Sequence, residues 1–188
     1  MIPSADPPPA NKTKKSPWLS FEARVELCRA MVDDCGLADQ VEVSDIEGSL
    51  PKPNYTVNTL KALLDLAPEN HAGSLVAILL GSDQFASFDT WHDPELITKM
   101  ADLILVARPG QAFEWPPGKV ALEARIWTLD VRTPPVSSTE IRKAIREGTP
   151  VPVGWLQPGV ISRMQQLTGK TIEVSSGETE EPTKRGNQ

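Results

Sequence analysis

The chain has 188 residues, of which 39% are hydrophobic and 23% are charged, as is ordinary for a globular domain with its own core. Its formal net charge of −6 excludes a broad nucleic-acid-binding surface, which needs a basic face. No apolar run approaches the roughly 20 residues that cross a bilayer, so we predict a cytoplasmic protein with neither a membrane nor a nucleic-acid partner.

The two ends of the chain differ from its middle. Residues 1–17 are rich in proline and lysine and are typical of an extended loop, while residues 175–188 contain no apolar residue and predict a disordered polar tail. We therefore expect one α/β domain over residues 1–174. Cys28 and Cys35 lack the spacing of a zinc site or a disulfide framework, and we interpret them as reduced thiols of a cytosolic protein.

Two helices and a short strand are predicted in the first third of the chain. Ser20 can cap one helix and Thr56 another, and the alternation in residues 40–45 ("QVEVSD") predicts a strand. The apolar positions recur at helical spacing. They are Phe21, Val25, Cys28 and Val32 in the first helix, and Val57, Leu60, Leu63 and Leu64 in the second.

Three apolar stretches follow, at residues 74–81, 102–110 and 124–131, with a helix predicted at Pro94–Met100. Their apolar character on both faces predicts strands of a mostly parallel sheet that is covered on both sides, as in a Rossmann-like α/β fold. Ligands of such sheets bind beyond the carboxyl ends of the strands. In this sequence those ends carry "GSD", "ARPG" and "PPVSSTEIR".

The last of these ends predicts a helix whose start suits a phosphate. Ser137 and Glu140 form a capping box, so the helix is expected to begin near Ser138 and to end at Gly148. The amide groups at a helix start attract anions, and Arg142 adds a cation one turn later. The alternative is a well-capped surface helix with solvated basic residues.

Single residues near the other ends allow two interpretations each. Asp83 could bind ribose hydroxyls or cap a helix, and Trp91 could stack on a planar ring or belong to the core. Arg108, which precedes a proline and a glycine, could meet a ligand or solvent.

Four stretches together resemble bacterial nicotinate-nucleotide adenylyltransferases. "LLGSDQFASFDTWHDPELITKMADLILVARPG" contains their G-x-D, tryptophan and R-P-G in order, "VSSTEIRKAIREG" resembles their I-S-S-T-x-I-R motif, and "NYTVNTLKAL" matches Y-T-x-x-T-L. "IPSADPPPANKTKKSPWLSFEARVELC" resembles the loop after their second strand and the helix behind it. The resemblance spans residues 2–168 and implies a Rossmann-like nucleotidyltransferase.

The resemblance implies an enzyme of NAD biosynthesis that transfers AMP from ATP to nicotinate or nicotinamide mononucleotide and releases pyrophosphate, with Mg²⁺ entering with ATP. Arg142 is the residue expected to stabilise charge in the transfer. The implied ATP-binding residues are Gly81, Asp83, Arg108, Ser137, Ser138, Thr139 and Arg142. The implied mononucleotide-binding residues are Tyr55, Thr56 and Trp91. No protein ligand to a metal is predicted, and a homo-oligomer is left open.

The family begins with G-G-[ST]-F-D-P-x-H-x-G-H, and this sequence does not contain that motif. Met1 aligns near the end of the family's second strand, so we expect the first strand and helix to be missing from this chain. His71 and His92 lie in no H-x-x-H arrangement and are interpreted as ordinary loop residues, and Ala10 and Asn11 stand where the histidine of a P-P-H-K loop is expected. Without H-x-G-H the chain is expected to be poorly active or inactive, and the alternative function is a noncatalytic nucleotide-binding or partner-binding relative. "TWHDP" argues against a pantetheine-phosphate or cytidylyl substrate.

Overall fold

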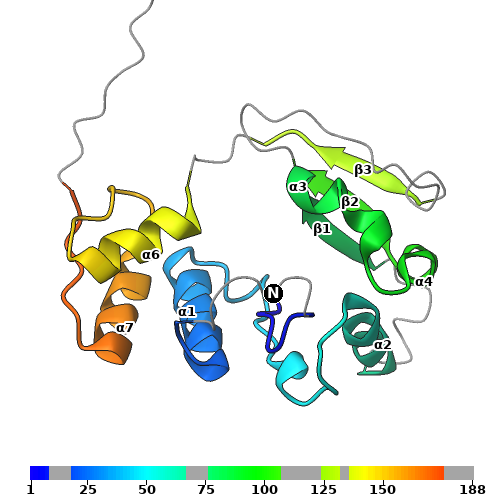
Figure 1. Cartoon of the computed structure of the whole chain (residues 1–188), viewed down its shortest axis with the longest axis horizontal. Helices are drawn as coiled ribbons and strands as arrows, with labels where there is room; N and C mark the ends of the chain where they lie inside the picture. Colours follow the sequence, from blue (N-terminus) through cyan, green and yellow to red (C-terminus); the bar gives the residue numbers. More distant parts are fainter. Residues whose placement is uncertain (9–17, 67–75, 107–123, 132–135, 176–188) are drawn as a thin grey trace, which may run out of the picture. The chain divides into compact units, whose positions relative to one another are not determined.

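The computed structural model describes residues 1–8, 18–66, 76–106, 124–131 and 136–175, in the element order labelled in Figure 1. The helical elements are α1 (Phe21–Asp34), η2 (Ile46–Gly48), α2 (Thr56–Leu66), α3 (Ser82–Phe85), η4 (Phe88–Thr90), α4 (Pro94–Met100), α6 (Ser138–Glu147) and α7 (Pro158–Thr168). The strands are β1 (Ala77–Gly81), β2 (Asp102–Val106) and β3 (Ile126–Leu129).

The chain divides into two units by its internal contacts. Unit 1 comprises Met1, Glu22–Val43 and Val136–Gln188, and unit 2 comprises Ile2–Phe21 and Ser44–Pro135. The helix predicted after Ser20 is confirmed as α1, and the helix predicted at Pro94–Met100 is confirmed as α4. The single domain over residues 1–174 and the polar tail over residues 175–188 remain predictions.

Unit 2 contains a three-stranded parallel sheet in the order β1-β2-β3. Leu79 pairs with Ile104, and Ile104 pairs with Trp127, so the three strands run in register and end at the same edge. The prediction of a parallel sheet built from these three apolar stretches is confirmed. Because parallel strands share an edge at their carboxyl ends, loops that follow β1, β2 and β3 all begin there.

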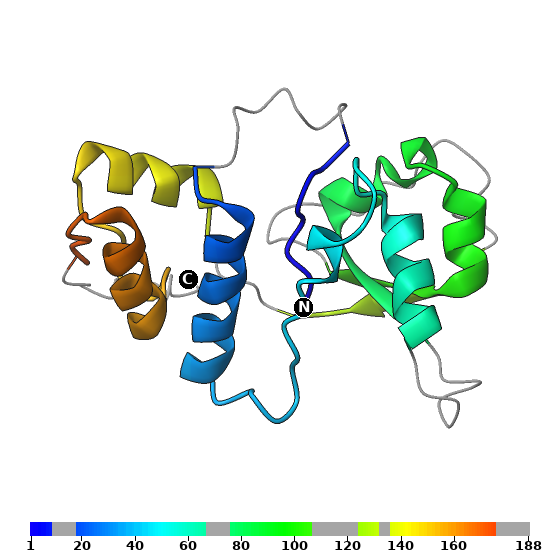
Figure 2. The ribbon, with the colours of Figure 1, turned by 90° about the horizontal axis from the view of Figure 1, so that it is seen from below.

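One face of the sheet belongs to the core of unit 2. Leu80, Leu103 and Leu105 are buried. Helices α2 and α4 contact each other and lie beside the sheet (Figures 1 and 2). The buried residues of this core are Val57, Leu60, Leu80, Phe85, Phe88, Ile97, Ala101, Leu103 and Leu105. Burial of these apolar side chains is the main term that stabilises the unit.

The prediction that all three strands are buried on both faces is wrong. Leu79 is 65% exposed and Trp127 is 60% exposed, and register places both on the face opposite the core. Leu129 is also exposed. An apolar run states only that a segment can be buried; which of its faces is covered depends on the elements that pack against it.

A buried carboxylate joins β2 to β3 at the amino ends of the strands. Asp102 is 5% exposed, its Oδ1 lies 2.9 Å from Nε of Arg125, and its Oδ2 accepts a 3.1 Å hydrogen bond from Nε1 of Trp127. Both oxygens therefore have partners, as a buried charge requires. This polar group lies at the edge of the sheet opposite the predicted ligand site.

Three local predictions in the first third of the chain are wrong. Residues 40–45 form no strand, because the amides of Gln40 and Val41 both donate to the carbonyl of Leu37 and so form a turn instead of a ladder. Helix α2 begins at Thr56 itself, which is its first residue and not its cap. Leu64 is 38% exposed and lies outside the buried stripe of α2.

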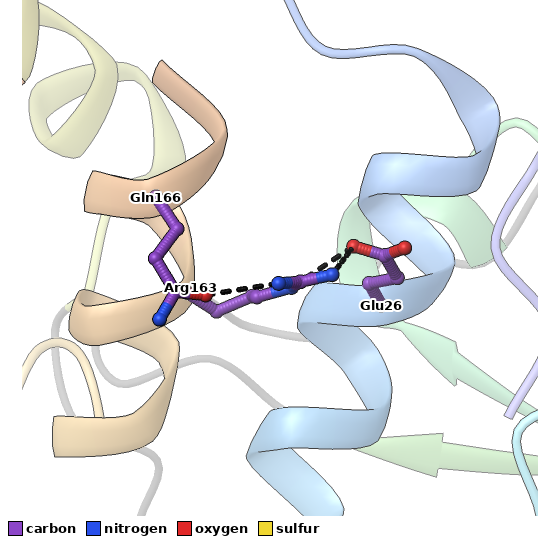
Figure 3. A network of polar contacts seen from close by, with 3 residues as sticks. All are labelled: Glu26, Arg163 and Gln166. Atoms are coloured by element: carbon purple, nitrogen blue, oxygen red, sulfur yellow. Dashed lines mark hydrogen bonds and ion pairs between the residues drawn. The ribbon is translucent and has the colours of Figure 1, made fainter. Parts of the chain in front are cut away.

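Unit 1 is held together by contacts between α1 and α7. Arg163 of α7 donates from Nε to Oε2 of Glu26 over 2.9 Å, with a second contact from Nη2, and from Nη1 to Oε1 of Gln166 over 2.9 Å (Figure 3). At the start of α7, Oδ2 of Asp34 accepts from the amides of Gly159 and Val160 at 2.7 and 3.3 Å. A side chain at the end of α1 thus caps the start of α7.

We expect Asp34→Ala to lower the free energy of unfolding by about 1 kcal/mol, the usual cost of losing an N-cap acceptor. The loss leaves two amides of α7 without their carboxylate partner and removes a negative charge from the positive end of the helix. Urea denaturation measures this change in the free energy of unfolding. Asp33→Ala is the matched control, because Asp33 is the exposed neighbour of Asp34 on α1. Equal midpoints for the two variants would contradict the capping role.

Candidate nucleotide-binding site

The carboxyl end of β1 leads directly into α3, whose N-cap is Gly81. A Cβ atom at position 81 would lie 2.8 Å from Oδ1 of Asp83, so the glycine leaves room for the carboxylate to fold back over the strand end. Asp83 is exposed in the first turn of α3 and is not its cap. The structure thus places an acidic side chain at the edge where α/β sheets bind ligands.

Two pairs of aromatic rings lie in unit 2. The ring centroids of Tyr55 and His92 lie 4.2 Å apart with a 31° interplanar angle, and those of Phe88 and Trp91 lie 5.3 Å apart with a 47° angle. Tyr55 and Trp91 both pack partly buried against the core of unit 2. Two of the three predicted mononucleotide residues, Tyr55 and Trp91, are thus only partly buried, and each retains an exposed fraction that a planar ligand could cover.

His92 was interpreted from the sequence as an ordinary loop residue, and its side chain is exposed. Its Nε2 lies 3.6 Å from Oδ2 of Asp93, and its ring stacks on Tyr55 at the start of α2. The position next to Trp91 was the only sequence signal for this contact. His92 is therefore part of the aromatic group although no motif assigned it.

The start of α6 in unit 1 has the predicted geometry. Oγ of Ser137 accepts a 3.4 Å hydrogen bond from the amide of Glu140, helix α6 begins at Ser138, and Gly148 ends it with a φ of 70°. Ile141 and Ile145 are buried on its inner face. The N-cap at Ser137, the start and the end of this helix are confirmed.

Arg142 reaches back toward the first turn of α6. Its Nη2 donates to Oγ1 of Thr139 over 3.3 Å, and its carbonyl accepts from Nε of Arg146 over 3.2 Å. Ser138, Thr139 and Arg142 are all exposed. A guanidinium, two hydroxyl groups and the positive end of a helix are thus directed at the same solvent-facing turn, an arrangement suited to a phosphate.

The predicted site residues divide between the two units. Five lie in unit 2 and four lie at the start of α6 in unit 1. They are Tyr55, Thr56, Gly81, Asp83 and Trp91 in the former, and Ser137, Ser138, Thr139 and Arg142 in the latter. Arg108 lies outside the described residues, as do His71, Ala10 and Asn11.

Other chemistries find no support in the described part of the chain. No three of its His, Cys, Asp or Glu residues come together as metal ligands. Cys28 and Cys35 are free, and burial raises the pKa of the Cys28 thiol, which disfavours a nucleophilic role. None of the described helices has the length and apolar character of a membrane span.

A parallel sheet with an acidic residue after a strand end, and a capped helix start with an arginine one turn later, are features typical of nucleotide-binding proteins. A sequence profile described as cytidylyltransferase-like matches residues 1–144. The chain belongs to this cytidylyltransferase-like family.

Known relatives identify the branch of the family. A probable nicotinate-nucleotide adenylyltransferase of Hydrogenovibrio crunogenus is 27% identical over 162 residues, which cover 80% of this chain and 73% of the relative. One of Bacteroides fragilis is 30% identical over 147 residues, 78% of this chain and 67% of the relative. The resemblance to nicotinate-nucleotide adenylyltransferases is confirmed by these relatives.

The fold is also that of a solved adenylyltransferase. The structure of Plasmodium falciparum nicotinic acid mononucleotide adenylyltransferase complexed with NaAD superposes with a TM-score of 0.65 at 15% identity. The match covers 88% of this chain and 78% of that protein. The nucleotidyltransferase fold expected from the sequence is confirmed.

Proposed function

We propose that this protein transfers the adenylyl group of ATP to nicotinate mononucleotide in NAD biosynthesis. A phosphate oxygen of the mononucleotide attacks the α-phosphorus of ATP, the bond from that phosphorus to the bridging oxygen breaks, and pyrophosphate leaves. The product is the dinucleotide deamido-NAD. The observation that carries the proposal is Arg142 beside Thr139 at the start of α6, within a chain of this family.

The start of α6 acts on the ATP phosphates. Amides of the first turn and the hydroxyl groups of Ser138 and Thr139 donate to phosphate oxygens, and Arg142 stabilises the charge that develops as pyrophosphate leaves. Ser137 supports this turn because its hydroxyl fixes the amide of Glu140. The chemistry needs positioning and positive charge, and no covalent intermediate is required.

Unit 2 acts on the rest of the substrates. Trp91 stacks on the pyridine ring, with Tyr55 and Thr56 beside it, and Asp83 accepts hydrogen bonds from ribose hydroxyls at the end of β1. Gly81 allows the close approach because it has no Cβ. Arg108 remains assigned to the ATP side by resemblance alone.

Magnesium enters with its substrate. Mg²⁺ would be held by the phosphates of ATP, the oxygen ligands that this ion usually takes from nucleotide substrates. When bound, the ion neutralises phosphate charge and makes pyrophosphate a better leaving group. The proposed reaction takes place in the cytoplasm.

The test follows label from ATP. With nicotinate mononucleotide and Mg²⁺, we expect label in the α-phosphate to enter the dinucleotide and label in the γ-phosphate to enter pyrophosphate. The acid mononucleotide is expected to react faster than the amide. Binding of nucleotide without any labelled dinucleotide, both in this chain and in a form extended to carry the G-G-[ST]-F-D-P-x-H-x-G-H segment, would instead favour the noncatalytic alternative and overturn the proposal.

A further inference from the structure

Three buried or half-buried polar side chains of unit 2 meet around the 3₁₀ turn η2. They are Glu47, Asn54 and Thr59, and we refer to them as the Glu47 cluster. Asn54 is 4% exposed and Thr59 is 6% exposed. Polar groups at this depth are stable only when hydrogen bonded, so their partners define what the cluster does.

The carboxylate of Glu47 joins two separate segments. Its Oε2 accepts a 3.0 Å hydrogen bond from the amide of Ala5, and its Oε1 accepts a 2.9 Å hydrogen bond from Oγ1 of Thr59 in α2. Hydrogen bonds to a charged acceptor are stronger than those between neutral groups. One side chain thus ties the first residues of the chain to the first turns of α2.

Asn54 makes the second connection. Its Oδ1 accepts from the amide of Asp6 over 2.7 Å, its own amide donates to the carbonyl of Asp6 over 2.8 Å, and its Nδ2 donates to the carbonyl of Glu47 over 3.1 Å. The side chain and the backbone of Asn54 are therefore both fixed. Asn54 immediately precedes Tyr55.

The cluster brackets the first turn of α2. Asn54 lies just before Tyr55 and Thr56, and Thr59 lies one turn after them, with its amide donating to the carbonyl of Tyr55 over 3.2 Å. The backbone that carries these two side chains is thus anchored on both sides. This backbone carries the Tyr55 ring, which lies against the ring of His92 next to Trp91.

We propose that Glu47 and Asn54 are positioning residues for the mononucleotide: by anchoring the chain start to the first turn of α2 they fix Tyr55 and Thr56 for the pyridine nucleotide and leave the ATP side unaffected. This inference rests on the proposed function. It assigns roles to residues outside every motif identified in the sequence. The needed property of Glu47 is hydrogen-bond acceptance, since both of its oxygens accept from neutral donors.

Calorimetric titration tests the inference. The whole chain is titrated with nicotinate mononucleotide and, separately, with a nonhydrolysable ATP analogue. We expect Glu47→Ala to raise the Kd for the mononucleotide about tenfold, as the loss of two charge-assisted hydrogen bonds implies. The Kd for the ATP analogue is expected to stay within about twofold. Glu47→Gln should restore most of the affinity, because its amide oxygen can face Ala5 while its NH₂ donates to the Thr59 hydroxyl.

Ser49→Ala is the matched control, because the Ser49 hydroxyl donates to the carbonyl of Ile46 in the same turn and reaches neither Ala5 nor α2. Unchanged mononucleotide affinity in Glu47→Ala, or an equal loss for both ligands, would overturn the inference. If Glu47→Ala does not fold, Asn54→Asp is titrated in the same way. Unchanged mononucleotide affinity in that variant, or an equal loss for both ligands, would then overturn the inference. An unsubstituted chain that binds the ATP analogue but no mononucleotide would overturn the proposed function itself.

Discussion

Replacing Arg142 by alanine, in a form of the protein that carries the G-G-[ST]-F-D-P-x-H-x-G-H segment, is expected to lower the rate of adenylyl transfer by about 100-fold or more, the effect typical of removing one preorganised charge from a transition state. Arg142 lies one turn into α6 and donates to Thr139, so its guanidinium is already directed at the helix start before ligand binds. Steady-state assays with saturating mononucleotide measure the change in kcat. The helix itself should persist, because its capping box and its buried isoleucines are untouched.

Lys143→Ala is the control for this variant, since Lys143 is an exposed cation on the same helix. If net charge near α6 were the cause, both variants would lose activity to a similar extent. We expect Lys143→Ala to stay within about threefold of the unsubstituted protein, as for an exposed charge screened by salt. Unchanged turnover in Arg142→Ala would contradict its role.

Replacing Trp91 by alanine is expected to raise the KM for the mononucleotide about tenfold or more and to change the KM for ATP little. The reason is the loss of a stacked ring, which contributes about 0.5–1.5 kcal/mol beyond the area that it buries. Separate titration of each substrate at saturating concentration of the other measures the two constants.

Trp91 also packs against Phe88, so the alanine variant is expected to lose some stability. Trp91→Phe separates the two effects, because it keeps an aromatic face for the pyridine ring and most of the packing. We expect its mononucleotide KM to lie near that of the unsubstituted protein. Equal increases of both KM values in Trp91→Ala would indicate a packing role instead.

Local signals in the sequence predicted the helices well. The capping box at Ser137 and the glycine at position 148 specify the ends of α6 through hydrogen bonds and backbone conformation that lie within a few residues. The strands at residues 77–81, 102–106 and 126–129 were also found, because long apolar runs are rare outside strands and buried helices. Parallel pairing was predicted from the alternation of strands and helices along the chain.

Tertiary contacts could not be predicted in the same way. Residues 40–45 alternate like a strand, but the amides of Gln40 and Val41 donate to the nearby carbonyl of Leu37 instead of to a neighbouring strand. Leu79 and Trp127 are apolar residues on an exposed sheet face, and no local pattern distinguishes that face from the covered one. These errors share one cause, which is that burial is decided by elements distant in sequence.

In the candidate site, too, residues with local signals were predicted and contacts between distant segments were not. Motif residues such as Asp83 and Arg142 could be named because their positions relative to strand and helix ends are local. The stacking of His92 on Tyr55 and the cluster around Glu47 join segments far apart in the chain, and a single sequence gives no signal for such pairs. Asn54 was missed for this reason, although it lies beside the Y-T-x-x-T-L motif.

The most direct measurement is a crystal structure of the protein with deamido-NAD bound. We expect the pyridine ring to stack on Trp91, a ribose to meet Asp83, and the phosphates to contact the first turn of α6 with Arg142. A ligand that contacts the aromatic group but leaves Arg142 in solvent, or one bound elsewhere on the chain, would contradict the assignment of both groups to one dinucleotide.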